Sequence, residues 1–187
     1  MSYRDPGPLP VPSVELIDKT VACLDRSLID GRGTTGRGLT DAPILVVHRG
    51  SRERYTDPCG VWLIDRRRVG HVEANEHARW TAGLLADADG NVLIEIEKRG
   101  RLGRVVAVVK NDRELARITG TWRSETIELA ASTRSWTVRW RRRTHDRAIC
   151  EGTVLLASAT GQALRITWRE RREHTTAVWL HRDLRTD

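Results

Sequence analysis

The sequence predicts an all-β protein, in which a meander of about twelve antiparallel strands closes into a barrel behind one N-terminal amphipathic helix. Four segments repeat one pattern, an apolar strand, a short polar turn and a returning strand: residues 61–72, 84–96, 108–118 and 155–166. Asp, Asn and Gly fill these turns because they tolerate positive φ and satisfy the backbone locally. A dozen antiparallel strands within 187 residues must also hide their edges, which favours closure into a barrel.

The N-terminal region divides into three short parts ahead of the barrel. Residues 1–12 hold four of the six prolines and are expected to form a poorly ordered arm, because proline lacks the amide donor that helices and ladders need. Residues 13–30 are predicted to be the helix, with Ser13 as its N-cap. Residues 31–42 are rich in glycine and are expected to be a flexible linker.

The predicted helix is one-sided. Its apolar residues recur at helical spacing and share one stripe: Ile17, Val21, Leu24 and Leu28. Such a helix packs one face against a sheet. The segment Val105–Val109 is apolar on both faces, which predicts that the helix covers it.

The barrel domain, residues 43–187, is expected to contain the strands 43–49, 60–65, 69–74, 79–87, 91–98, 104–110, 115–122, 125–131, 134–143, 147–157, 162–170 and 175–181. Side-chain alternation assigns their faces. In strand 134–143 it places Trp136, Val138 and Trp140 inside. In strand 162–170 it places Leu164, Ile166 and Trp168 inside.

The opposite faces of these two strands carry arginines, and they form the main candidate site. An anion-binding stripe is predicted from Arg139, Arg141, Arg143, Arg165 and Arg169. Guanidinium groups bind phosphate oxygens well, and the net charge of +7 admits anionic partners. Only three of the 32 basic residues are lysines, which an arginine-biased genome explains as readily as phosphate binding does.

A second cluster could supply metal ligands. In an extended strand His71, Glu73 and His77 would project from one face, which makes them a weak candidate for a metal site. A solvated polar strand end explains the same residues. The three cysteines are far apart and form no CxxC pair, so no cofactor or redox centre is predicted. Together with the lack of an export signal, they indicate a cytoplasmic protein.

The serial hairpins with turns at Asp87–Gly90 and 159–161 resemble the tubby C-terminal-like domains, including the LURP-one-related and phospholipid scramblase groups. The resemblance covers residues 60–170. It implies a twelve-stranded barrel and binding to membranes or phosphoinositides. Members of that family thread a hydrophobic C-terminal helix through the barrel, whereas the polar end of this chain, 179–187, cannot supply one.

No catalytic motif is present, so we expect a non-enzymatic binding or interaction module. The arginine stripe favours contact with anionic phospholipid. Three alternatives stay open: an enzyme or a carrier that holds a small apolar ligand inside the barrel, a nucleic-acid binder that contacts the phosphate backbone, and a module for a protein partner.

Overall fold

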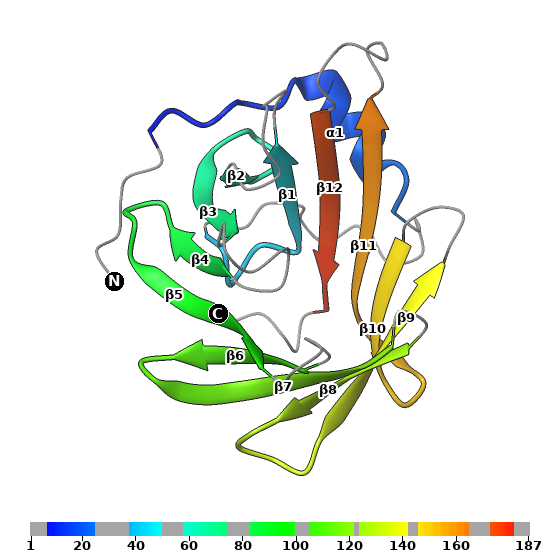
Figure 1. Cartoon of the computed structure of the whole chain (residues 1–187). Helices are drawn as coiled ribbons and strands as arrows, with labels where there is room; N and C mark the ends of the chain where they lie inside the picture. Colours follow the sequence, from blue (N-terminus) through cyan, green and yellow to red (C-terminus); the bar gives the residue numbers. More distant parts are fainter. Residues whose placement is uncertain are drawn as a thin grey trace.

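The fold is a closed barrel of twelve antiparallel strands with one short helix on its wall, which confirms the predicted fold class (Figure 1). The computed structural model describes the residues 7–24, 38–49, 58–74, 83–99, 105–121, 124–141, 146–164 and 173–181. Each strand pairs with its sequence neighbours, and β1 pairs with β12 to close the ring.

The described elements are α1 (Val14–Val21), β1 (Ile44–Arg49), β2 (Cys59–Trp62), β3 (Arg68–Ala74), β4 (Gly83–Asp87), β5 (Val92–Arg99), β6 (Val105–Lys110), β7 (Arg113–Thr121), β8 (Ser124–Leu129), β9 (Ser135–Arg141), β10 (Asp146–Glu151), β11 (Val154–Leu164) and β12 (Glu173–Leu180). Tight turns with positive φ join several of them, as expected. Asn111 and Asp112 both adopt positive φ in the hairpin between β6 and β7.

One predicted hairpin is displaced in the structure. The turn expected at 159–161 lies inside β11, where Ala159 pairs with Val178 and Gly161 with Thr176. The chain turns instead at Gly152, whose φ is +58°. The single strand predicted at 147–157 is therefore two strands, β10 and β11. The backbone of Leu164 belongs to β11, but its side chain lies outside the described part of the structure, so its predicted inward position stays a prediction.

Residues that pair across neighbouring strands lie on the same face of the barrel wall, so following these pairs from strand to strand gives one row of residues for each face. One row runs through Trp140, Arg147, Ala159, Val178 and Leu45. The adjacent row runs through Arg139, Ala148, Ser158, Trp179 and Ile44. The first row faces the inside of the barrel, because Leu45 belongs to a buried cluster on the side away from the helix. The second row faces outward.

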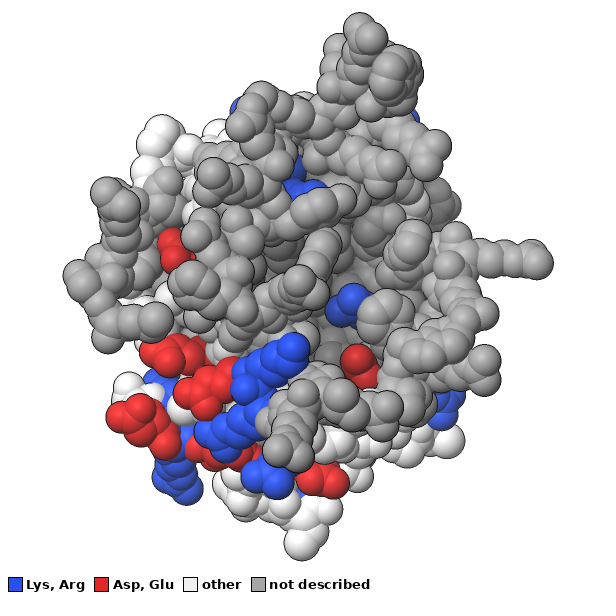
Figure 2. Space-filling model, in the orientation of Figure 1, with Lys and Arg blue, Asp and Glu red and all other residues white. Residues whose placement is uncertain are grey.

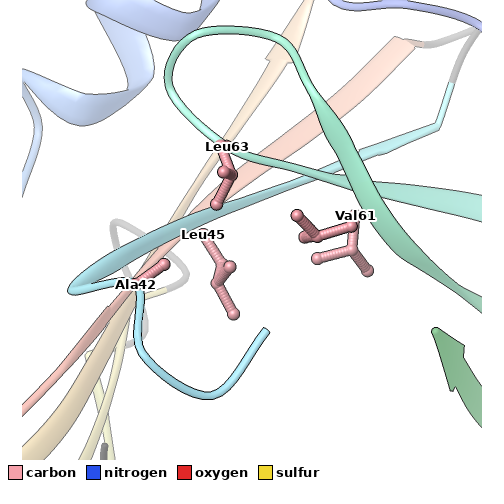
Figure 3. Close-up of a cluster of buried hydrophobic side chains, with 5 residues drawn as sticks. Ala42, Leu45, Val61 and Leu63 are labelled. Atoms are coloured by element: carbon pink, nitrogen blue, oxygen red, sulfur yellow. The ribbon is translucent and has the colours of Figure 1, made fainter. Parts of the chain in front are cut away.

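The inner cluster packs residues of β1–β3 against the segment that leads into β1. Leu45, Val61 and Leu63 are its central side chains, and Ala42 closes it from the segment before β1. Figure 3 shows these four side chains together, with α1 on the other side of the strands. Residues 38–43 lie within the ring of strands (Figure 1). This side of the barrel interior is therefore filled by the protein itself.

The helix packs on the outside of the barrel, against β12 and β11. Ser13 is its N-cap, as predicted, and accepts a hydrogen bond from the amide of Leu16 at 3.2 Å. Ile17 packs with Val46 and Trp62 on the outer face. The helix ends at Val21, earlier than predicted, and residues 25–30 lie outside the described part of the chain.

The prediction that the helix covers Val105–Val109 is wrong. Ala107 of this strand is fully buried on the outer face between Glu97 and Arg117, with which it pairs. The long aliphatic stems of such side chains shield a small apolar neighbour while their charged ends stay in water. No helix is needed to bury it.

The segments before β1 also pack more closely than predicted. Leu9, within the proline-rich arm, is only 7 % exposed and joins the cluster of Ile17. Pro12 is fully buried. Ala42, within the expected linker, is 0 % exposed. Residues 7–12 and 38–42 are thus parts of the folded domain, while 1–6 and 31–37 lie outside the described residues.

Replacing Gly70 by alanine is expected to destabilise the barrel by about 1–3 kcal/mol, because an overpacked site forces the backbone to shift. A Cβ at Gly70 would overlap the carbonyl oxygen of Ala86 and lie 2.9 Å from Cδ1 of Leu39. Gly38→Ala is the control, since its Cβ would make one ordinary contact, 3.6 Å from Asp41. Urea unfolding measures both variants, and equal midpoints would contradict the expectation.

Candidate functional site on the inner wall of the barrel

The burial of the inward side chains differs from one part of the barrel wall to another. On β5–β10 most inward apolar side chains are only half-buried: Ile94, Ile96, Val106, Val108, Ile118, Ile127, Trp136 and Ile149. On β1–β3 the inner side chains of Leu45 and Val61 are buried. In a closed barrel, an inward side chain stays accessible only where the interior contains open space.

Barrel size gives the physical reason for this space. The inward side chains of about eight strands just fill a barrel, and the diameter grows with the number of strands. Twelve strands therefore enclose more volume than their own side chains occupy. Within the described residues, the buried clusters draw on α1, its flanking segments, β1–β3 and β12, and none includes an inner residue of β5–β10.

Arg147 is a charged residue in this inner wall. It pairs with Trp140 and Ala159, and the next inward residue of β10 is Ile149. Its side chain is accessible to solvent, yet loss of hydration is the largest influence on its pKa and lowers it. Neighbouring protein atoms therefore replace part of the hydration of this guanidinium, although the side chain remains exposed. The carboxylate of Glu125 acts on the same pKa in the opposite direction.

Charged residues occupy inner-row positions near one end of the barrel. Arg49, Lys98, Glu125 and Arg147 each lie within two residues of a strand end there. These four residues belong to the inner row. For example, Arg49 lies two residues after Val47 on the same face of β1, and Lys98 pairs with Val106. Among the described residues of the inner row at this end, there are thus three cations and one carboxylate.

An indole on the same wall adds a polar atom. Trp136 belongs to the inner row with Ile127 and is two positions from Val138 on β9. Its Nε1 is buried and has no hydrogen-bond partner among the described residues. The predicted inward direction of Trp136 and Val138 is thus confirmed.

The predicted anion-binding stripe is only partly within the described chain. Arg139 is exposed on the outer face, as predicted. Arg141 ends β9, and its side chain is not described. Arg143, Arg165 and Arg169 lie outside the described residues, as do Ile166 and Trp168. The stripe of five arginines therefore stays a prediction.

Elsewhere on the outer face, arginines are paired with carboxylates. Arg117 bonds Glu114 at 2.9 Å and is the main cause of the lowered pKa of that carboxyl. Arg99 bonds the same carboxylate, and it also bonds Glu97 at 2.9 Å. Figure 2 shows acidic and basic side chains interleaved on this part of the surface. Such a surface offers little net charge to an anion.

An outer pocket of about 450 Å³ lies beside the turn between β8 and β9. Its charged lining is balanced, with Arg117 and Arg134 facing Glu114 and Glu128. Arg134 also bonds Glu151 at 2.7 Å and lowers the pKa of that carboxyl. The charged lining of the pocket therefore gives no preference for an anion or a cation.

Only part of the weak candidate metal site, predicted from His71, Glu73 and His77, lies within the described residues. Nε2 of His71 lies 3.5 Å from Glu73, which confirms that these two side chains share a face. His71 is buried at 1 % exposure, while His77 lies outside the described residues. In the part of the chain that the structure covers, no three His, Cys, Asp or Glu side chains gather closely enough to hold a metal ion.

Comparison of the chain with protein-family models, with curated proteins and with solved structures found no match in any of the three. Among the described residues, no helix has the length and apolar character needed to cross a bilayer.

Proposed function

We propose that this protein binds a small apolar molecule inside its barrel and acts as a carrier or sensor of that molecule. The observation behind the proposal is the half-buried apolar wall of β5–β10 within a closed ring of twelve strands. Ligand sites in proteins are typically concave, mostly apolar and supplied with a few polar groups. The inner wall has this composition.

The inner site is favoured over the outer arginine face for an electrostatic reason. Several arginines of the described outer surface are bonded to carboxylates, among them Arg99, Arg117 and Arg134. Exposed ion pairs of mixed sign do not attract anions strongly. The inner wall offers exposed apolar area, which gains free energy when a ligand covers it.

Filling the interior with a larger side chain tests the proposal. Ile118→Trp places an indole on the inner wall, and we expect it to weaken binding of the fluorescent probe N-phenyl-1-naphthylamine at least about tenfold, because the probe and the indole compete for one space. Fluorescence titration measures the affinity. Thr119→Trp is the matched control, since Thr119 is the next residue of β7 and lies on the outer face.

The two variants separate the possible outcomes. Weaker binding in Ile118→Trp, with normal binding in Thr119→Trp, supports the interior site. Equal binding in both variants, or no binding of the probe by the unaltered protein, overturns it. Binding of phosphatidylserine vesicles that Arg139→Gln abolishes would then favour the outer face, where Arg139 is exposed.

A further inference from the structure

The interior differs in polarity between its two ends. At one end the inner cluster of Leu45, Val61 and Leu63 fills the space next to β1–β3 with apolar side chains. At the other end lie Arg147 and Glu125, each one residue after the start of its strand. A molecule that suits this interior has an apolar part and a charged part.

The sign of the charged part follows from the residues at that end. Among the described residues at that end, Arg49, Lys98 and Arg147 occupy inner positions. Glu125 also lies in this row. Glu125 attracts the Arg147 guanidinium, but loss of hydration remains the larger effect on its pKa. A further negative charge beside Arg147 would therefore be favourable, whereas a cation would not.

The planar shape of the arginine side chain also suits it to bind an anionic head group. Its planar guanidinium donates two parallel hydrogen bonds to a carboxylate or phosphate, and such charge-assisted bonds are strong where water is partly excluded. The stem of Arg147 stands beside Ala159 and two residues from Ile149, so apolar surface continues up to the charged group.

We propose that the interior binds an amphipathic anion, with its apolar tail along the inner wall of β5–β10 and its carboxylate or phosphate head group on Arg147. This inference rests on the proposed function, because it assigns a ligand class to the same interior. Arg147 sets the preference for the anionic head, and Glu125 opposes it.

The test compares two ligands that share a tail. Decanoate and 1-decanol are titrated against the probe-loaded protein at about pH 8, where the carboxylate is ionised. We expect the protein to bind decanoate more tightly than decanol. Arg147→Gln should reduce decanoate affinity at least about tenfold and leave decanol affinity nearly unchanged, because only the anion loses charge-assisted bonds. Glu125→Gln should raise decanoate affinity, and decyl phosphate should follow decanoate if the head group is recognised by charge.

Arg139→Gln is the matched control, because it removes the same charge from the neighbouring strand on the outer face. It should leave both affinities unchanged. If the protein binds decanoate and decanol equally, or if Arg139→Gln acts like Arg147→Gln, the head-group assignment is wrong while the interior site stands. If neither ligand displaces the probe, the proposed function itself fails. Circular dichroism and thermal unfolding confirm that each variant is folded.

Discussion

Ile17→Ala is expected to lower the free energy of unfolding by about 3 kcal/mol, within the range of 2–5 kcal/mol for large-to-small changes in a core. Ile17 is 1 % exposed and packs with Leu9, Val46 and Trp62 between the helix and the outer wall. Removing three carbons there leaves a cavity that a short helix and a hydrogen-bonded barrel wall cannot close. Chemical unfolding followed by tryptophan fluorescence measures the loss.

Val14→Ala on the same helix is the control. Val14 is 54 % exposed, so its truncation should change stability by no more than about 0.5 kcal/mol. If both variants unfold at the same denaturant concentration as the unaltered protein, the helix does not dock on the barrel. A large loss in Val14→Ala would contradict the expectation, because alanine favours the helix more than valine does and an exposed side chain has little packing to lose.

The architecture was predictable because local and long-range signals agree in this chain. Turn residues such as Asn111 and Asp112 mark the hairpins, and strict alternation around Trp136 and Val138 identifies the inner face. Serial hairpins leave closure as the simplest way to remove two free edges. The sequence therefore carried the fold class, the number of strands and most of their positions.

The error at β10 and β11 has a specific cause. Residues 158–161, Ser-Ala-Thr-Gly, are small and polar, as in a turn. In the structure they lie within β11. Thr160 of this segment is buried and pairs with Ala177, which packs in the cluster of Leu24 next to the helix. Long-range packing of this kind does not show in the local composition, which resembles that of a turn.

The candidate site was harder to predict, because its polar residues look like solvent-facing ones. Arg147 is the second residue of its strand, a position where charged side chains are usually exposed. The alternation of residues predicted an anion site from the arginines of the outer face instead. The available signal was parity, since Arg147 alternates in step with Ile149, and Glu125 in step with Ile127. The half-buried state of the inward side chains on β5–β10 depends on barrel width and packing, which no single segment encodes.

Stability is expected to fall by about 3 kcal/mol between about pH 6.5 and pH 4, through the protonation of His48. Burial lowers the pKa of His48 from 6.5 to about 4, and its exposed fraction is 2 %. Between these two pH values the imidazole of His48 binds a proton in the unfolded chain but stays neutral in the folded protein. The full contribution is therefore present above pH 6.5 and is lost as the pH falls toward 4. Urea unfolding at several pH values measures the slope.

His48→Gln isolates this group from the other titrating residues. Nδ1 of His48 lies 2.8 Å from Oγ1 of Thr175, and the amide of glutamine replaces this hydrogen bond without titrating. All other side chains are the same in the two proteins, so their contributions cancel in the difference. Carboxyls whose pKa is lowered, such as Glu114 and Glu151, lose their contribution only below their ordinary range, near pH 4 and lower. The unaltered protein should thus lose stability relative to His48→Gln as the pH falls from 7 to 4.5. Parallel curves over that interval would show that His48 is protonated in the folded state as readily as in the unfolded one.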